Sequence, residues 1–243
     1  PIHAHAHTHT HTYHSPYYNS HRRGNQANMK NQYTNDWPTS KEFHREADAL
    51  IPILKGLDVL IKQLIGILGS PFKKDNGSGS GSGRKTAIVM VANEGVIDLV
   101  LNFICSCQKQ AGNIDLSTLI VFLGQPEYIP LIESMGAKAI YHPFYGTIPK
   151  KAASSYGDNI FGKLMWLKAS SVYVTHKAGY DVIFQDADLI WLRNPILHLQ
   201  SSKHDVAFMD DGARSTRFTP FFVNSGFYYI KNEPSSSKYF MEL

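Results

Sequence analysis

The chain has 243 residues, of which 43% are hydrophobic, 12% aromatic and 18% charged, so it can bury a sizeable core and is not disordered as a whole. Its 24 Lys and Arg residues and 20 Asp and Glu residues give a formal net charge of +4, which is too small to indicate a nucleic-acid partner. The two cysteines exclude a disulfide-rich scaffold and a cysteine-based zinc finger. Because the sequence starts at Pro1 and ends at Leu243, inside what reads as a helix, we expect it to be a fragment.

Residues 1–40 read as a low-complexity segment with almost no periodic apolar pattern. Seven of the twelve histidines lie in it: His3, His5, His7, His9, His11, His14 and His21. Neutral imidazoles are good ligands for zinc, copper and nickel, so one interpretation is a metal-binding tract. The other is a disordered tail, which we favour because no carboxylate or cysteine accompanies the histidines to complete a defined site.

Residues 41–76 are expected to form an amphipathic helical stem. Apolar residues recur at three- to four-residue spacing, at Leu50, Leu54, Leu57, Ile61, Leu64 and Leu68. Lys55, Asp58 and Lys62 share the other face and argue against a membrane span, because ionisable groups in mid-span cost about 2.5–3.5 kcal/mol each. Residues 41–69 therefore predict a stem or a helix that self-associates. The Gly/Ser-rich run at 77–84 predicts a flexible linker and a domain boundary.

From residue 85 to residue 243, apolar runs typical of buried strands alternate with helical patterns. Strands are expected at 86–92, 117–123, 137–141, 182–184, 206–209 and 221–230. Helices are expected at 94–110, 126–135, 159–178 and from near Ser235 onward, with Gly136 and Gly179 ending two of them. This order predicts a three-layer α/β domain on a mostly parallel sheet, in which ligands bind beyond the carboxyl ends of the strands.

Two carboxylates follow one of the predicted strands. The segment Gly179–Pro195, GYDVIFQDADLIWLRNP, places Asp186 and Asp188 between two apolar runs. Two like charges at a strand end repel each other, so their presence calls for a compensating positive charge. Hard divalent cations prefer oxygen ligands and could supply it. A cation held there can bridge the phosphates of a nucleotide diphosphate and neutralise a departing diphosphate. A D-x-D match alone also occurs by chance in surface loops, but its place between buried runs favours a metal or phosphate site.

Haloacid-dehalogenase-like phosphatases also carry D-x-D after a strand and use the first Asp as a nucleophile. Their pattern asks for Thr or Val four residues after that Asp, where this sequence has Ile190. Their motif also usually lies on the first strand of the domain, whereas this one comes about 100 residues after the linker. This interpretation therefore stays a minor alternative.

The chain from about Thr86 to Leu243 resembles the nucleotide-diphospho-sugar transferases of glycosyltransferase family 77. The resemblance rests on the order and spacing of several pieces, each of which is weak alone. They are Ala92-Asn93-Glu94-Gly95, Asn102-Phe103, Lys163 and Lys168, Gly179-Tyr180-Asp181-Val182, Asp186-Ala187-Asp188, Trp191-Leu192-Arg193-Asn194-Pro195 and Asn224-Ser225-Gly226-Phe227-Tyr228-Tyr229. Residues 1–83 lie outside this resemblance.

The resemblance implies a Rossmann-like GT-A fold, a Mn²⁺ (or Mg²⁺) cofactor and a UDP-sugar donor. Family members transfer xylose, galactose or arabinose with retention, here to a glycan or glycoprotein acceptor. The resemblance also implies a Golgi enzyme with one N-terminal membrane anchor, although no anchor is visible in this sequence. Two other classes stay open: an Asp-nucleophile phosphatase or nucleotide hydrolase, and a non-catalytic nucleotide-sugar-binding domain. No catalytic residue is assigned.

The resemblance further implies roles for the donor-binding residues. Asp188 is expected to ligate the metal, and Asp186 to contact the ribose or the metal. Lys168 either faces the diphosphate or is an ordinary solvated helix lysine. The uridine is expected at the end of the first strand, on Ala92, Asn93 and Glu94.

Residues near the C-terminus are expected to complete the site. Asp210 and Asp211 have two interpretations: they are expected either to bind sugar hydroxyls or to form a turn before Gly212. A close backbone approach to the donor sugar or acceptor is expected at Asn224, Ser225 and Gly226, because glycine has no side chain and the Asn amide both donates and accepts. Trp191 is expected in the core, and His142 and His176 are expected to be structural. GT-A enzymes commonly have a third metal ligand, often a histidine, which cannot be identified in this sequence.

Overall fold

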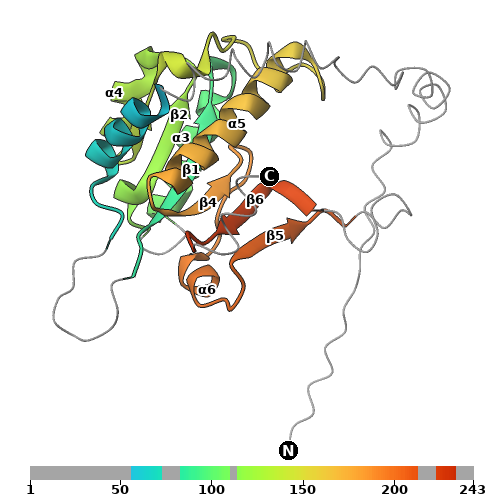
Figure 1. Cartoon of the computed structure of the whole chain (residues 1–243). Helices are drawn as coiled ribbons and strands as arrows, with labels where there is room; N and C mark the ends of the chain where they lie inside the picture. Colours follow the sequence, from blue (N-terminus) through green and yellow to red (C-terminus); the bar gives the residue numbers. More distant parts are fainter. Residues whose placement is uncertain (1–55, 73–82, 110–113, 213–222, 234–243) are drawn as a thin grey trace, which may run out of the picture. The chain divides into compact units, whose positions relative to one another are not determined.

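The computed structural model describes residues 56–72, 83–109, 114–212 and 223–233 (Figure 1). The chain divides into Pro1–Ile51 and Pro52–Leu243, and every described residue lies in the second unit. The His-rich tail, most of the Gly/Ser linker and the helix expected from Ser235 fall outside these ranges, so the predicted domain boundaries stay predictions. Among the described helices, none has the length and apolarity to cross a bilayer.

Six strands form one sheet in the order β3-β2-β1-β4-β6-β5. Their bounds are β1 Thr86–Ala92, β2 Leu119–Leu123, β3 Lys138–Ile140, β4 Asp181–Gln185, β5 Val206–Asp210 and β6 Val223–Ile230. The first four strands pair in parallel, which confirms the mostly parallel sheet predicted from the sequence. Strand β6 is antiparallel to both of its neighbours, a direction that the sequence pattern did not specify.

Four labelled helices cover the sheet: α3 Ile97–Lys109, α4 Ile129–Ser134, α5 Asn159–Lys177 and α6 Ile196–Gln200. The expected helices at 94–110 and 126–135 begin as short 3-10 turns, η2 Glu94–Val96 and η4 Pro126–Tyr128, which are common at helix ends. Further 3-10 turns precede β2 (η3, Leu116–Thr118) and follow β3 (η5, Pro143–Tyr145). Helix α6 was not expected from the sequence.

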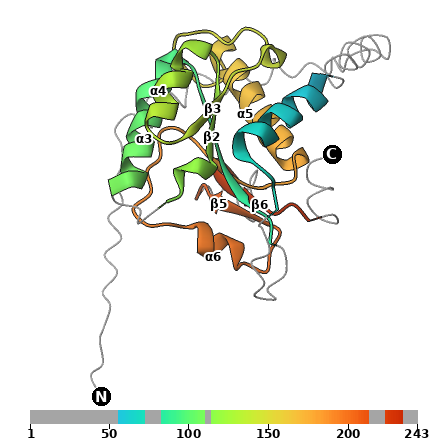
Figure 2. The ribbon, with the colours of Figure 1, turned by 90° about the vertical axis from the view of Figure 1, so that its left-hand side faces the viewer.

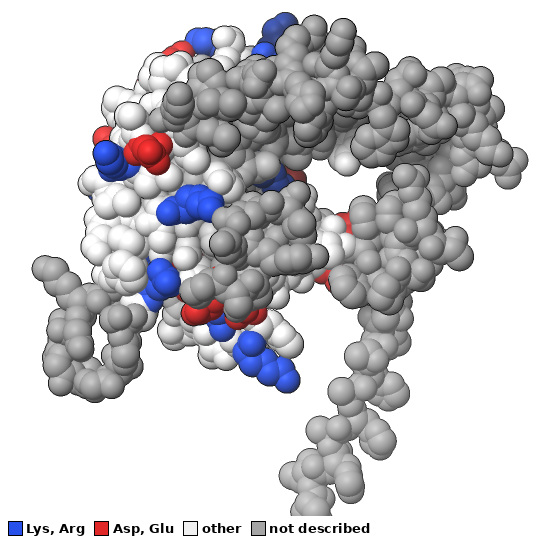
Figure 3. All heavy atoms as spheres, viewed as in Figure 1, with Lys and Arg blue, Asp and Glu red and all other residues white. Residues whose placement is uncertain are grey.

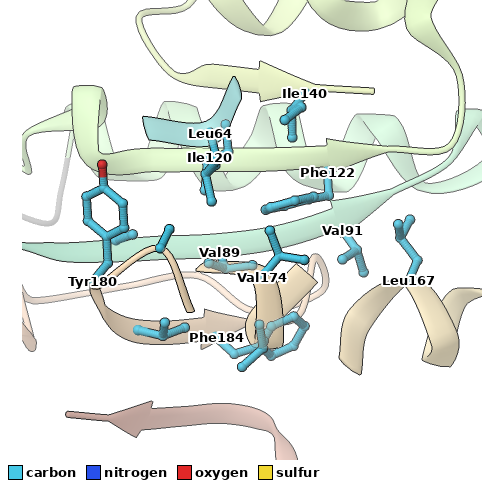
Figure 4. Close-up of a cluster of buried hydrophobic side chains, with 14 of the residues drawn as sticks. Leu64, Val89, Val91, Ile120, Phe122, Ile140, Leu167, Val174, Tyr180 and Phe184 are labelled. Atoms are coloured by element: carbon cyan, nitrogen blue, oxygen red, sulfur yellow. The ribbon is translucent and has the colours of Figure 1, made fainter. Parts of the chain in front are cut away.

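Alternate residues of the strands point to opposite faces of the sheet and build two apolar cores. On one face Val89, Phe122 and Phe184 pack under α5, as Figure 4 shows for a cluster that also includes Val174. On the other face Ile88 and Val121 pack under α3 and α4. Figure 2 shows the resulting helix–sheet–helix layers, which confirm the predicted three-layer α/β architecture.

A helix at residues 56–68 lies on the same face of the sheet as α5 (Figure 2). Its side chains Leu57, Leu60 and Leu64 belong to the core cluster of that face. The chain after this helix is also attached, because Lys85 N–H donates to the Pro71 carbonyl at 2.7 Å. Three apolar side chains of the expected amphipathic helix are therefore buried within this chain, and self-association through residues 41–69 stays a prediction.

The topology brings the functional residues to one edge of the sheet. Strands β1 and β4 pair in parallel up to Val89 and Phe184, so both carboxyl ends lie at the same edge. Gly179, with φ of 97°, turns the chain from the end of α5 into β4. Helix α5 therefore runs back along β4, and a residue in the middle of α5 comes level with the end of that strand.

Candidate donor-binding site

The carboxylate of Asp186 meets the ammonium group of Lys168 directly after β4. Lys168 Nζ lies 2.9 Å from Asp186 Oδ1 and 3.1 Å from Oδ2. The Lys168 side chain is 7% exposed and that of Asp186 is 33% exposed. Beneath the ammonium group, 4.5 Å away, is the centroid of the Phe184 ring. Lys168 is therefore not an ordinary solvated helix lysine, which was one of the two expectations for it.

Burial and charge act against each other on Asp186. Its pKa is raised above the usual aspartate value, and burial is the largest cause. The Lys168 ammonium works in the opposite direction, while the nearby charge of Asp188 adds to the rise. The pairing with Lys168 thus offsets part of the penalty for placing a second carboxylate at this strand end.

Strand β6 closes the site from the other side. Asp186 N–H donates to the Gly226 carbonyl at 2.7 Å, and Gly226 N–H donates to Asn224 Oδ1 at 2.7 Å. Asn224 Nδ2 in turn donates to Asp211 Oδ1 at 2.7 Å. Ser225 Oγ lies 3.5 Å from Lys168 Nζ, so residues predicted from α5, β4, β5 and β6 meet in one network.

Asp188 lies on the turn that follows Asp186 and is exposed. It is the more accessible carboxylate of the pair, because both Asp186 oxygens contact Lys168. Across the described part of the chain, no group of three or more His, Cys, Asp or Glu residues is placed to hold a metal ion. The third ligand that could not be identified in the sequence is therefore not found among these residues either.

The residues expected to contact uridine are packed against the segment 148–152. Ala92 is fully buried, and Asn93 is 1% exposed. Asn93 Nδ2 donates to the carbonyls of Pro149 and Lys151, both at 2.7 Å, whereas its Oδ1 is buried without a hydrogen-bond partner. Asn93 thus holds this segment against the end of β1, and its role toward a nucleotide stays a prediction.

Glu94 is exposed beside the same segment. Its carboxylate pairs with Lys150 at 3.2 Å, and Lys150 also pairs with Glu127 at 2.8 Å. The Glu94 N–H donates to Gln125 Oε1 at 2.8 Å. The surface pairs contribute little to stability, but they leave Glu94 accessible at the sheet edge where Asp188 also lies.

Asp210 and Asp211 have different surroundings. Asp210 Oδ1 accepts a hydrogen bond from Gly212 N–H at 2.9 Å, and Gly212 has φ of 73°. This is the turn that the sequence offered as one of two interpretations. Asp211 instead joins the β6 network through Asn224.

Gln185, to which no role was assigned from the sequence, supports the motif together with the expected core residue Trp191. Gln185 is fully buried; its Nε2 donates to the Asp186 carbonyl at 2.8 Å, and its Oε1 accepts from Trp191 Nε1 at 2.7 Å. Trp191 also packs edge-on against Phe103, as expected for a core residue. The signal for Gln185 was a polar residue at the end of an otherwise apolar strand.

The two histidines singled out in the sequence have structural roles. His142 Nδ1 accepts a hydrogen bond from Phe144 N–H at 3.1 Å and so caps η5. His176 is buried on α5, with Nε2 3.4 Å from the Lys231 carbonyl. Burial lowers the pKa of both imidazoles.

A hollow of about 480 Å³ opens beside the first turns of α5. Its lining residues are Tyr145, Gly146, Thr147, Gly157, Asp158, Asn159, Gly162, Lys163 and Trp166. At about 100° per residue, Lys168 points roughly half a turn away from Asn159. The hollow and the Asp186 carboxylate therefore lie on different sides of α5, and none of the predicted site residues lines the hollow.

Residues 131–243 match the family model described as nucleotide-diphospho-sugar transferase. This match confirms the resemblance predicted from the sequence. It includes α5, the turn with Asp186 and Asp188, and strand β6.

Curated relatives from Arabidopsis thaliana support the same resemblance. The chain is 23% identical to the beta-arabinofuranosyltransferase RAY1 over 62% of this chain and 28% of that protein. It is 33% identical to UDP-D-xylose:L-fucose alpha-1,3-D-xylosyltransferase 1 over 26% of this chain and 18% of that protein. The chain thus spans about a quarter or less of the length of these two relatives.

Solved structures show partial similarity. The glycosyltransferase GlyE of Streptococcus pneumoniae has a TM-score of 0.39 and 15% identity, over 65% of this chain and 37% of that chain. The glucosyl-3-phosphoglycerate synthase of Mycobacterium tuberculosis, in complex with Mn²⁺, UDP and glucosyl-3-phosphoglycerate, has a TM-score of 0.38 and 16% identity. That match covers 62% of this chain and 57% of the synthase.

Proposed function

We propose that this chain carries the donor-binding part of a metal-dependent glycosyltransferase that uses a UDP-sugar. One observation carries the proposal: Asp186 and Asp188 follow a central parallel strand at the sheet edge where the β1 end also lies, within the region matched by the transferase family model. Open α/β sheets bind ligands at such an edge. The relatives' names support transfer of a sugar rather than hydrolysis of a phosphate.

Asp186 and Asp188 suit a cation whose coordination shell is completed by oxygens of the substrate. Mg²⁺-type ions are usually held by one or two carboxylates together with substrate phosphates and water. Asp188 is exposed and lies two residues after Asp186, which is paired with Lys168, so Asp188 can supply such an oxygen. When bound, the cation would neutralise charge on the departing diphosphate. Mn²⁺ or Mg²⁺ therefore fits this donor set without a third protein ligand from the described residues.

The protein's own groups would bind and orient the donor. Ser225 is the exposed residue of β6 beside Asp186, where a donor sugar or acceptor hydroxyl can reach a polar edge. Gly226 itself is buried, and a Cβ there would already meet Asp186 Oδ2 at 2.8 Å. Ala92 ends the neighbouring β1 strand and Asn93 and Glu94 follow it, where we place the uridine. Asp211 is held toward the same network and suits a sugar hydroxyl.

The names of the relatives guide the choice of substrates. They specify an arabinofuranosyl and a xylosyl transfer, so pentose donors are the first to test, with a glycan or glycoprotein acceptor. In Figure 3, acidic, basic and uncharged side chains of the described residues are interspersed on the face shown, in keeping with a carbohydrate partner rather than nucleic acid. Retention at the anomeric carbon and residence in the Golgi as a type II membrane protein stay proposals that rest on the family resemblance alone.

The test is calorimetric titration of UDP into the whole 243-residue chain, with and without Mn²⁺. We expect Mn²⁺-dependent binding that weakens about tenfold or more in Asp188→Asn, which keeps the shape of the side chain but removes its charge. Asp98→Asn on the exposed side of α3 is the matched control and should bind like the unaltered chain.

Binding that needs no Mn²⁺, or that survives Asp188→Asn, would contradict the metal-dependent site. The phosphatase alternative makes a different prediction, a phosphoaspartate on Asp186 that mass spectrometry would detect after incubation with a phosphomonoester. A non-catalytic domain would bind UDP but transfer no pentose from any donor, which radiolabelled UDP-pentoses can show once the protein is made at the full length of its relatives.

A further inference from the structure

Among the described residues, the Asp186 carboxylate is the nearest hydrogen-bonding partner of the Lys168 ammonium group. It lies within 3.1 Å of both carboxylate oxygens, and the Ser225 hydroxyl follows only at 3.5 Å. At 7% exposure, the Lys168 side chain has little access to water. A buried ammonium group without its carboxylate strongly destabilises a protein. We therefore expect Lys168 to remain paired with Asp186 when a ligand binds.

The rest of Asp186 is fixed as well. Its N–H donates to the Gly226 carbonyl, and its own carbonyl accepts from Gln185 Nε2. A methyl group on Gly226 would lie 2.8 Å from Asp186 Oδ2, so β6 approaches the carboxylate closely. Both main chain and side chain of Asp186 are therefore held by protein groups, whereas Asp188 is exposed on the turn that follows.

We propose that Lys168 is a positioning residue: it neutralises and fixes Asp186, and the fixed Asp186 presents Asp188 as the only carboxylate of the pair that contacts the cation directly. The proposal rests on the proposed donor site. It assigns the two carboxylates of the motif different tasks. It also gives Lys168 a task through Asp186, in place of the expected contact with the diphosphate.

A charge-balanced double variant separates this proposal from direct ligation by Asp186. Asp186→Asn and Lys168→Met together remove both charges of the pair and nearly keep its shape. Each single substitution instead leaves one charge of the pair without its partner: the buried Lys168 ammonium group or the partly buried Asp186 carboxylate. The four chains to compare are the two single variants, the double variant and Asp188→Asn, all in the whole chain, with Lys177→Met at the far end of α5 as a control.

Two measurements decide the outcome: Mn²⁺ affinity by electron paramagnetic resonance, and UDP affinity in Mn²⁺ by calorimetry. We expect the double variant to lose less affinity than Asp188→Asn, which should weaken binding about tenfold or more, because Gly226 and Gln185 still hold the main chain at position 186 when both charges are removed. Each single variant should bind more weakly than the double variant. Melting temperatures identify a single variant that fails to fold, in which case the double variant and Asp188→Asn still decide.

Equal losses in the double variant and Asp188→Asn would overturn the proposal, because Asp186 would then ligate the cation itself. A double variant no better than the single variants would also overturn it, since the two charges would not act as a pair. If the unaltered chain shows no Mn²⁺-dependent UDP binding, the proposed function fails and this inference fails with it, which is a result distinct from either of the others.

Discussion

Gly226 lies where a side chain would collide with the Asp186 carboxylate. The added Cβ would be 2.8 Å from Asp186 Oδ2 and 2.9 Å from Asn224 Oδ1, closer than real contacts of this kind. Gly226→Ala should therefore push the Asp186 carboxylate away from Lys168. We expect the unfolding free energy to fall by about 1–3 kcal/mol, which lowers the melting temperature, and Mn²⁺-dependent UDP binding to weaken. Thermal melts and calorimetry measure the two effects.

The control for Gly226→Ala is Gly66→Ala in the helix at 56–68. A Cβ at Gly66 meets no atom within 4 Å, and alanine is favoured over glycine inside a helix by about 1 kcal/mol. This substitution should stabilise the chain slightly and leave UDP binding unchanged. A loss of binding in both variants would show that the effect at Gly226 is not local to Asp186.

The buried His176 should make the folded chain less stable as the pH falls. Burial lowers the pKa of its imidazole below the value of about 6.5 in an unfolded chain. As the pH falls through that value, the unfolded state takes up a proton that the folded state resists, so folding stability is lost. His142 acts in the same direction, so the two must be separated by substitution.

The measurement is the melting temperature between pH 7.5 and pH 5 for the unaltered chain and His176→Gln. We expect the unaltered chain to lose more stability on acidification than the variant. His198→Gln, at an exposed position of α6, is the control and should follow the unaltered chain. Parallel curves for all three proteins would contradict a buried neutral His176.

The helix at residues 56–68 packs on the sheet face that α5 also covers and contributes to the core there. Leu60 is fully buried in the core cluster under α5, whereas Val59 beside it is 61% exposed. Leu60→Ala should lower the unfolding free energy by about 2–5 kcal/mol, and Val59→Ala should change it by less than about 0.5 kcal/mol. Denaturant unfolding of the whole chain measures both, and equal values would mean that this helix does not share the core.

The sequence pattern predicted those elements whose apolar runs are long. Strand β1 and helix α5 were placed to within about one residue, because one is apolar throughout and the other has the Gly179 end signal. Helix α6 was missed because Ile196–Gln200 is too short to show helical periodicity. The packing of the helix at 56–68 on this sheet was not predicted, because a single amphipathic helix does not reveal what its apolar face meets; the buried residue is also Leu60, where the predicted face had Ile61.

Site residues that come directly after a strand could be predicted from the sequence. Contacts that depend on how the strands pair could not. Lys168 lies nine residues before the end of α5, about 14 Å along the helix, and Asp186 lies five residues after the start of β4, about 17 Å along the strand. Their contact therefore follows from the tight turn at Gly179. The link from Asn224 to Asp211 depends on the antiparallel β6, whose direction the sequence did not give.

Across the whole unit, the site joins elements from distant parts of the sequence. The site combines a residue of α5, residues that follow the ends of β4 and β5, and a residue inside β6: Lys168, Asp186, Asp211 and Gly226. Strand β4 lies inside the sheet between β1 and β6, and β6 lies between β4 and β5. A ligand bound across them therefore stabilises the cooperative fold rather than one loop, because it binds the native state only.

This linkage gives a prediction for the whole molecule. UDP and Mn²⁺ together, at about 100 times their dissociation constant, should add about 2.7 kcal/mol and raise the melting temperature by roughly 5–11 °C. UDP alone or Mn²⁺ alone should raise the melting temperature by less than half as much, because the diphosphate completes the coordination shell of the cation. Scanning fluorimetry measures these shifts, and Asp188→Asn should abolish the joint effect. Equal shifts with Mn²⁺ alone and with both would place the cation away from the diphosphate and contradict a shared site at the end of β4.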